Sequence, residues 1–261
     1  MASCEFSESL FESYHARQFE RKYESIMPQY IPTRIEEGTS GIDMAHFSHF
    51  FSAYFQYKVP KSLKGNTYRC IGLTGNKYNF HVYNRPSRRA NPQFQTLYEW
   101  TSFEANVFYC LPNFNTQRQF FSSYSNILDS TCYFKVSEMM DPHSANFNDE
   151  NHYVYFDDTS NKANMYSEEK LELKKYNAKT LFPDPEQREL IQITSLQKHL
   201  IERFEILRGF VFERMKFGNQ LMNFEEDLNL FEKANNDDKI GMLSYWYKEI
   251  LNLNWFLIGV E

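Results

Sequence analysis

The sequence predicts a mixed α/β fold, and three observations lead to that class. Segments with helical spacing of apolar residues alternate with short apolar runs of strand character. Their order is a helix, several strands, a helix, a strand, further α/β units and a helical tail, without internal repeats. The composition is 42% hydrophobic and 24% charged, with 25 Phe and 18 Tyr, which predicts a globular domain with a core built largely on rings.

The first expected element is a helix near the N-terminus. In SESLFESYHARQFERKYESIM the apolar residues recur at near-helical spacing. Ser3 and Ser7 are both candidates for its N-cap, and Pro28 ends the run. The loop EEGTSG then leads into the first strands.

Strands are expected next. IDMAHFSHFFSAYFQYKV is rich in aromatic residues, is broken near Ser48 and His49, and is predicted to form two adjacent strands of a hairpin. YRCIGLTGNKYNFHVYNRP continues the strand character, and KYNFHVYN is its clearest part. Further strands are predicted for NVFYCLP, TCYFKV and HYVYFDD.

Helices are expected between and after these strands. NPQFQTLYEWTSFEA opens with Asn and Pro, which is typical of a helix start, and TQRQFFSSYSNIL is a second helix. From about Glu186 onward the pattern is helical: LIQITSLQKHLIERFEILRGFVFERM, NFEEDLNLFEKA and IGMLSYWYKEILNLNWFLI. We therefore predict a domain over residues 1–180 and an α-helical C-terminal extension over 181–261.

Composition excludes several classes of protein. No run approaches 18 apolar residues, so no membrane span is expected. The N-terminus carries acids where a signal peptide would have basic residues and an apolar core. The four cysteines form no C-x-x-C pair, so we expect reduced thiols in a cytoplasmic protein without zinc: Cys4, Cys70, Cys110 and Cys132.

Charge is distributed unevenly along the chain. The net charge is −6, yet residues 44–98 hold eight Lys/Arg and no acid. Such a segment is either a solvated face or a surface for an anionic partner. We take the second interpretation as the working hypothesis, with nucleic-acid contacts at Lys61, Lys64, Arg85, Arg88 and Arg89.

A candidate metal site lies at the ends of the expected hairpin. Asp43 opens one strand and Gln56 and Lys58 close the next, so antiparallel pairing would return them to one end of the sheet. Carboxylate and amide oxygens suit Mg²⁺, and Lys58 would neutralise charge on a phosphate or orient a water. Because an amide is a weaker ligand than a carboxylate, another acid is needed. Glu37 and Glu8 are the candidates.

Each of these residues also has a structural interpretation. Asp43 follows Gly41 and is a possible turn residue, Gln56 a possible interior amide, and Glu8 a possible helix-surface acid. Gln95, on the helix after the basic segment, and His152, at the start of a strand, are accessory candidates. Both are equally compatible with structural positions.

The order of these motifs resembles the core of the PD-(D/E)xK nuclease superfamily, which has the restriction-endonuclease-like fold. A helix, an acidic loop, GID, a strand, FQYK, a helix and a strand follow one another over about residues 5–160. SESLFESY, PTRIEEGTSGID, FQYKVP, FHVYNRP, NVFYCLPNF and HYVYFDD together also resemble an uncharacterised bacterial family with a Gln-x-Lys version of that site.

The resemblance implies an Mg²⁺- or Mn²⁺-dependent endonuclease that acts on DNA in defence against foreign DNA. It also implies a catalytic set of Glu37, Asp43, Gln56 and Lys58, with Glu8 as a further ligand. Two alternatives stay open: a non-catalytic protein that keeps the fold and binds nucleic acid or a partner, and an interaction subunit of a larger machine. The apolar residues of 186–261 further predict a homodimer or a partner subunit.

Overall fold

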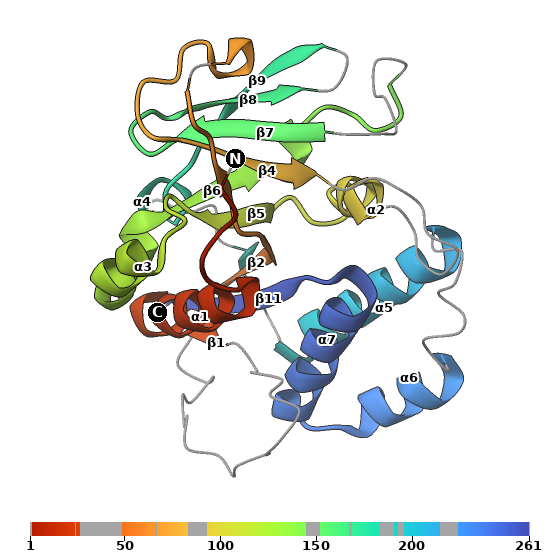
Figure 1. Ribbon diagram of the computed structural model, residues 1–261. Helices are drawn as coiled ribbons and strands as arrows, with labels where there is room; N and C mark the ends of the chain where they lie inside the picture. Colours follow the sequence, from red (N-terminus) through yellow and green to blue (C-terminus); the bar gives the residue numbers. More distant parts are fainter. Residues whose placement is uncertain are drawn as a thin grey trace.

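The computed structural model describes residues 2–23, 25–26, 49–65, 67–82, 93–144, 152–166, 169–182, 191–192, 196–214 and 224–260. Over these residues the fold is mixed α/β, with two β-sheets and seven α-helices (Figure 1). The predicted class is confirmed at this level. None of the described helices is long and apolar enough to cross a membrane.

The larger sheet is the centre of the molecule. Its strands run in the order β1 (Ser25–Ile26), β11 (Asn254–Val260), β2 (His49–Tyr57), β5 (Val107–Pro112) and β6 (Thr131–Lys135), and β10 (Ile191–Gln192) pairs with the start of β2. Strand β5 is parallel to β2, and the other pairs are antiparallel. The carboxyl ends of β2 and β5 therefore meet at one edge of the sheet.

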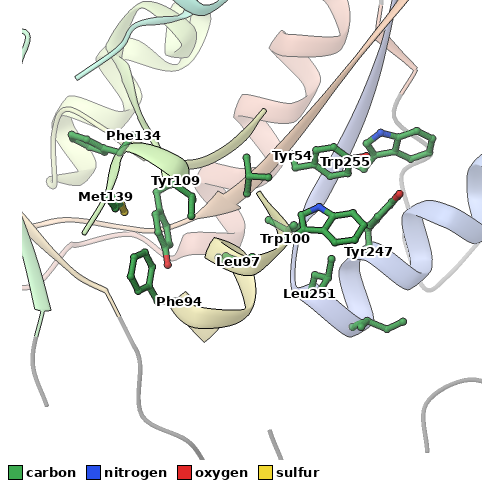
Figure 2. Close-up of a cluster of buried hydrophobic side chains, with 14 of the residues drawn as sticks. Tyr54, Phe94, Leu97, Trp100, Tyr109, Phe134, Met139, Tyr247, Leu251 and Trp255 are labelled. Carbon is green, nitrogen blue, oxygen red and sulfur yellow. The ribbon is translucent and has the colours of Figure 1, made fainter. Parts of the chain in front are cut away.

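Both faces of this central sheet are buried, because apolar side chains predominate on both sides of its strands. One face packs against α2 (Gln93–Trp100), α5 (Leu196–Arg214) and α7 (Asn236–Leu251). Figure 2 shows this core, in which the ring of Tyr54 lies 5.1 Å from that of Tyr247. The opposite face is covered by α1 (Glu8–Tyr23), α3 (Gln117–Ser123) and α4 (Ala178–Leu181).

The second sheet is antiparallel and lies on the face of the central sheet that holds α2. Its order is β3 (Lys61–Ser62), β4 (Lys77–Val82), β7 (His152–Asp157), β8 (Lys162–Tyr166) and β9 (Lys170–Lys174). Phe80 on β4 joins the two sheets, since its ring lies 5.4 Å from Tyr109 of β5 and 5.5 Å from Phe134 of β6. The remaining elements are α6 (Phe224–Lys233) and three short 3-10 turns, η2 (Tyr68–Cys70), η3 (Tyr124–Ser130) and η4 (Val136–Glu138).

Several predicted elements are confirmed. Helix α1 begins after Ser7, whose hydroxyl accepts the backbone N–H of Leu10 at 3.1 Å, so Ser7 is the cap. The strands expected in KYNFHVYN, NVFYCLP, TCYFKV and HYVYFDD are β4, β5, β6 and β7, and the helix expected after Asn91 and Pro92 is α2. Strands β8 and β9 were not anticipated as individual elements.

The first strand of the predicted hairpin lies outside the described residues, and the described neighbours of β2 are other strands. The antiparallel neighbour of β2 is β11, paired with it from His49 to Phe55, while β5 and β10 occupy the other edge. This leaves no continuous edge of β2 for a hairpin partner. Asp43 and Glu37 themselves lie outside the described residues.

The C-terminal segment is not helical throughout, which corrects a prediction. Helix α7 ends at Leu251, and Asn252 adopts a left-handed conformation with φ 53°. Residues 254–260 then form β11 between β1 and β2. The end of the expected extension therefore lies inside the central sheet.

The apolar residues that favoured an oligomer interface are mostly buried within the chain. Those of α5, α7 and β11 are at most 5% exposed at Leu200, Phe204, Leu207, Phe210, Trp246, Trp255 and Phe256. Among the described residues of these elements, the exposed large apolar side chains are Phe212 and Tyr245, at 69% and 38%. The pattern reflects packing on two sides inside one chain, so it no longer supports a dimer.

Candidate functional site at the end of strand β2

A cavity of about 400 Å³ opens where the end of β2 meets the starts of α1 and α2 and strand β4. Its walls mix charged, amide and aromatic groups: Glu8, Lys58, Val59, Lys61, Asn79, Phe80, His81, Gln93 and Tyr153. Ligand sites in proteins are commonly concave and lined in this way, with a few converging polar groups. The cavity is therefore the candidate functional site.

The backbone fixes where Gln56 and Lys58 point. Gln56 is the penultimate residue of β2 and lies opposite Tyr109 in the parallel ladder. The N–H of Lys58 donates to the carbonyl of Cys110 at 3.1 Å and extends this ladder by one residue. Because side chains alternate along a strand, Gln56 and Lys58 share a face, the one on which Tyr54 packs against Tyr247.

A chain of hydrogen bonds joins these two residues through α2. The amide nitrogen of Gln93 donates to Oε1 of Gln56 at 3.1 Å, and Nζ of Lys58 donates to Oε1 of Gln93 at 3.2 Å. Gln56 is only 2% exposed and also donates to the carbonyl of Tyr57 at 3.3 Å. Gln56 thus lies behind Gln93, and the cavity wall itself carries Gln93 and Lys58.

Glu8 and Lys58 face the cavity as an electrostatically coupled pair. Burial raises the pKa of Glu8, and Lys58 opposes that rise, with smaller effects of Glu12 and Lys248. Burial lowers the pKa of Lys58, and the carboxylate of Glu8 partly restores it, while Lys248 lowers it further. Lys248 also bonds Glu12 at 2.9 Å. Each charge is costly in this environment, so each gains from a further partner of opposite sign.

The oxygen atoms at the cavity are of the type that binds a hard cation. Carboxylate and amide oxygens at the cavity come from Glu8 and Gln93, with Gln56 behind them, and such oxygens suit Mg²⁺ or Mn²⁺. Glu8 is the one carboxylate among the described residues of the wall. The described part of the chain also holds no cluster of three or more His, Cys, Asp or Glu side chains suited to a metal. A complete metal site would need the acids predicted at Glu37 and Asp43.

The structure brings together four residues chosen from the sequence: Glu8, Gln56, Lys58 and Lys61 lie in or against the cavity wall. Lys64 is exposed and does not contribute to the wall. The remaining predicted residues lie outside the described part of the chain: Glu37, Asp43, Arg85, Arg88 and Arg89.

The two accessory candidates lie elsewhere. Gln95 donates to Glu99 at 2.9 Å along α2, and His152 is buried on β7 opposite Val82. Neither contributes to the cavity wall, whereas Gln93, which the sequence reasoning passed over, does. The Asn-Pro start signal directly before Gln93 marks it as a first-turn residue. Its direction depends on how α2 docks, which the sequence pattern does not reveal.

Comparison of the chain with protein-family models, with curated proteins and with solved structures finds no match.

Proposed function

We propose that the protein is a metal-dependent nuclease whose reaction takes place in the cavity at the end of β2. One observation carries the proposal: Glu8, Lys58 and Gln93 line a single cavity, with Gln56 hydrogen-bonded behind them. They come from α1, the end of β2 and α2, so three separate segments converge on this point. Perturbed charged groups at a cavity are typical of functional sites.

Each residue has a role in this proposal. The ammonium group of Lys58 would bind the scissile phosphate and stabilise the charge that develops on it. Glu8 and the amide oxygens would hold Mg²⁺ or Mn²⁺, and Glu37 and Asp43 would complete the ligand set. The cation would lower the pKa of water, so that hydroxide is available as the nucleophile at neutral pH. Gln93 positions Lys58, because its Oε1 accepts from Nζ.

The restriction-endonuclease-like core, DNA as the substrate and a role against foreign DNA remain proposals from the motif resemblance. Two features support them. Gln56 and Lys58 end a strand of the central sheet, and a glutamate at the start of α1 lies at the same cavity. Fold analogy alone is a weak guide to function, so the biochemical test decides.

One observation favours a second candidate, a non-catalytic nucleic-acid-binding protein. Gln56 and Gln93 are neutral and hydrogen-bonded to one another, and Glu8 is the single carboxylate among the described wall residues. A cavity of this kind binds a phosphate through Lys58 and Lys61 without cleaving it. A homodimer, predicted from the tail, has lost its main support because most apolar side chains of the described α5, α7 and β11 are buried within the chain.

A cleavage assay tests both candidates. Labelled DNA and RNA are incubated with the wild type, Lys58→Ala and Lys179→Ala in Mg²⁺, in Mn²⁺ and in EDTA. Lys179 is an exposed lysine on α4, so its variant controls for the loss of a surface charge. We expect metal-dependent cleavage that falls by at least about 100-fold in Lys58→Ala alone. Binding without cleavage in either metal would support the non-catalytic candidate, and neither binding nor cleavage would exclude both.

A further inference from the structure

The second sheet has two chemically different faces. Its inner face is apolar and packs into the core, through residues such as Tyr78, Phe80, Val154, Phe156 and Met165. The alternate positions of the same strands form the outer face, since successive side chains of a strand point to opposite sides. In Figure 1, strands β7, β8 and β9 lie at the end of the molecule away from α6 and α7. On the outer face, the short turn η2 and the residues after it cover Tyr155 and Asn164, which are 4% and 2% exposed, while Tyr153 and Tyr166 stay half-buried.

This outer face is basic. Its alternate positions carry five lysines: Lys61, Lys77, Lys162, Lys170 and Lys174. They carry two acids, and neither leaves a free negative charge on the surface. Asp157 is buried and accepts backbone N–H groups of Thr74 at 2.7 Å and Ser160 at 2.6 Å, while Glu172 pairs with Lys162 at 2.8 Å. Three of the lysines belong to β8 and β9, beyond the acid-free segment 44–98.

A row of rings crosses this face from the cavity to the edge strand. The strand register places His81 of β4 opposite Tyr153 of β7, Tyr153 opposite Tyr166 of β8, and Tyr166 opposite Lys170 of β9. The rings of His81 and Tyr153 are 4.9 Å apart, and both residues line the cavity. The row therefore begins at the candidate site and ends at a lysine.

A second, exposed ring lies beside the row and is held in place. Tyr68 of η2 is 66% exposed, and its ring lies 6.0 Å from that of Tyr166. Arg69 donates from Nε to the hydroxyl of Tyr68 and from Nη1 to that of Tyr155, both at 2.9 Å. The hydroxyl of Tyr166 donates to the carbonyl of Tyr68 at 3.3 Å. These contacts fix η2 on the sheet and order the ring before any ligand binds.

We propose that this outer face binds single-stranded nucleic acid and leads it into the cavity. Bases would stack on Tyr153, Tyr166 and Tyr68, and phosphates would contact the lysines beside them, including Lys61 and Lys170. Neighbouring strands are about 4.8 Å apart, so the row from β4 to β9 spans about 14 Å. Open sheets with aromatic residues stack two or three bases in this way.

Charge complementarity selects this ligand together with the rings of the face, which are exposed at Tyr68 and half-buried at Tyr153 and Tyr166. The lysines alone would accept any polyanion, including a duplex. Rings on an open sheet add affinity only for bases whose faces are free, and the bases of a duplex are stacked on one another. The inference rests on the proposed function and deepens it by giving its substrate class, because the row begins in the same cavity as Lys58 and Glu8.

Fluorescence anisotropy in EDTA tests the proposal. Labelled 12-nucleotide single strands of DNA and of RNA, and the matching DNA duplex, are titrated with the wild type and variants. We expect tighter binding of a single strand than of the duplex, weakening about tenfold in Tyr153→Ala and in Tyr166→Ala. Tyr153→Phe keeps the ring and should weaken binding less than Tyr153→Ala does. Lys170→Glu, an exposed change that leaves the core intact, should weaken binding several-fold.

Tyr124→Ala is the matched control, because Tyr124 is 53% exposed on η3, outside this sheet. Equal affinity for duplex and single strand, or unchanged affinity in both alanine variants, would overturn the proposal. Binding of single strands without cleavage in metal would leave this inference standing and reject the nuclease. Cleavage that is unchanged in the variants of Tyr153, Tyr166 and Lys170 would support the nuclease and reject this inference.

Discussion

The carboxyl end of β2 carries two polar clusters on opposite faces of the central sheet, and the two differ in what surrounds them. On one face, Gln56 and Lys58 are joined through Gln93 beside a cavity of about 400 Å³. On the other face, Tyr57 is joined to His15 of α1 and to Tyr133 of β6. Adjacent residues of one strand thus supply an open cluster and a closed one.

The closed cluster is complete without a ligand. The ring of His15 is fully buried, with Nδ1 at 2.9 Å from the hydroxyl of Tyr57 and Nε2 at 2.7 Å from that of Tyr133. Burial lowers the pKa of His15 to about 3, so the ring is neutral and donates one hydrogen bond while accepting the other. Phe19 and Phe55 pack around it, and no wall residue of the cavity belongs to this cluster.

The open cluster combines two charges that burial penalises, those of Glu8 and Lys58, with a space large enough for a ligand. The two clusters at the end of β2 therefore differ in kind. His15, Tyr57 and Tyr133 satisfy one another and stabilise the fold, whereas Glu8 and Lys58 border a cavity and are available for binding. Variants of the closed cluster should therefore change the free energy of unfolding, and variants of the open cluster should change metal binding or cleavage.

The largest effect on stability is expected from the closed face. His15→Ala removes a ring from the core and leaves the hydroxyls of Tyr57 and Tyr133 without that partner. We expect a loss of about 3 kcal/mol in the free energy of unfolding, measured by urea denaturation. Nucleic-acid binding and cleavage by the folded fraction should be unchanged. A loss of activity without a loss of stability would contradict the structural role of the His15 cluster.

The stability that neutral His15 contributes should also depend on pH. Its folded pKa, about 3, is below the ordinary value of 6.5, so between these values the unfolded chain binds a proton that the folded chain excludes. The contribution is complete above pH 6.5 and is lost as the pH falls toward 3, by about 1.4 kcal/mol per pH unit. The difference in unfolding free energy between the wild type and His15→Gln isolates this effect. A pH-independent difference would show that His15 is not titrating as a buried group.

These two faces also show how far the sequence could be read. The alternation around Gln56 and Lys58 predicted that both would share a face, and the structure places Lys58 in the cavity wall. The closed cluster could not be predicted, because His15, Tyr57 and Tyr133 are far apart in the chain and meet only through helix docking. The sequence pattern predicts helix for NWFLIGV, which forms β11, because a short apolar run after a helix has no periodicity that distinguishes helix from strand. Asn252, in its left-handed conformation, was the available stop signal.

On the open face, Gln56→Glu should strengthen metal binding. The new carboxylate would lie beside Gln93 and near Lys58, and carboxylates bind Mg²⁺ and Mn²⁺ better than amides do. We expect Mn²⁺ affinity, measured by isothermal titration calorimetry, to rise about fivefold, with Tyr57→Phe as the control on the closed face. Unchanged Mn²⁺ affinity would argue that Gln56 is an interior amide with no access to a bound ion.

The smallest effect on stability is expected at Gln93, the residue that links Gln56 to Lys58. It is half-buried at the first turn of α2, so water can replace its amide in Gln93→Ala, and we expect a loss of only about 0.5 kcal/mol. Lys58 would nevertheless lose the acceptor at 3.2 Å that holds its ammonium group in the cavity wall. Cleavage should therefore fall by about tenfold, since a mispositioned group stabilises the transition state less well. Gln95→Ala, two residues along the same helix, is the matched control and should cleave as the wild type does. If both variants behave alike, the hydrogen-bonded chain through Gln93 does not position Lys58, and the open cluster would be as structural as the closed one.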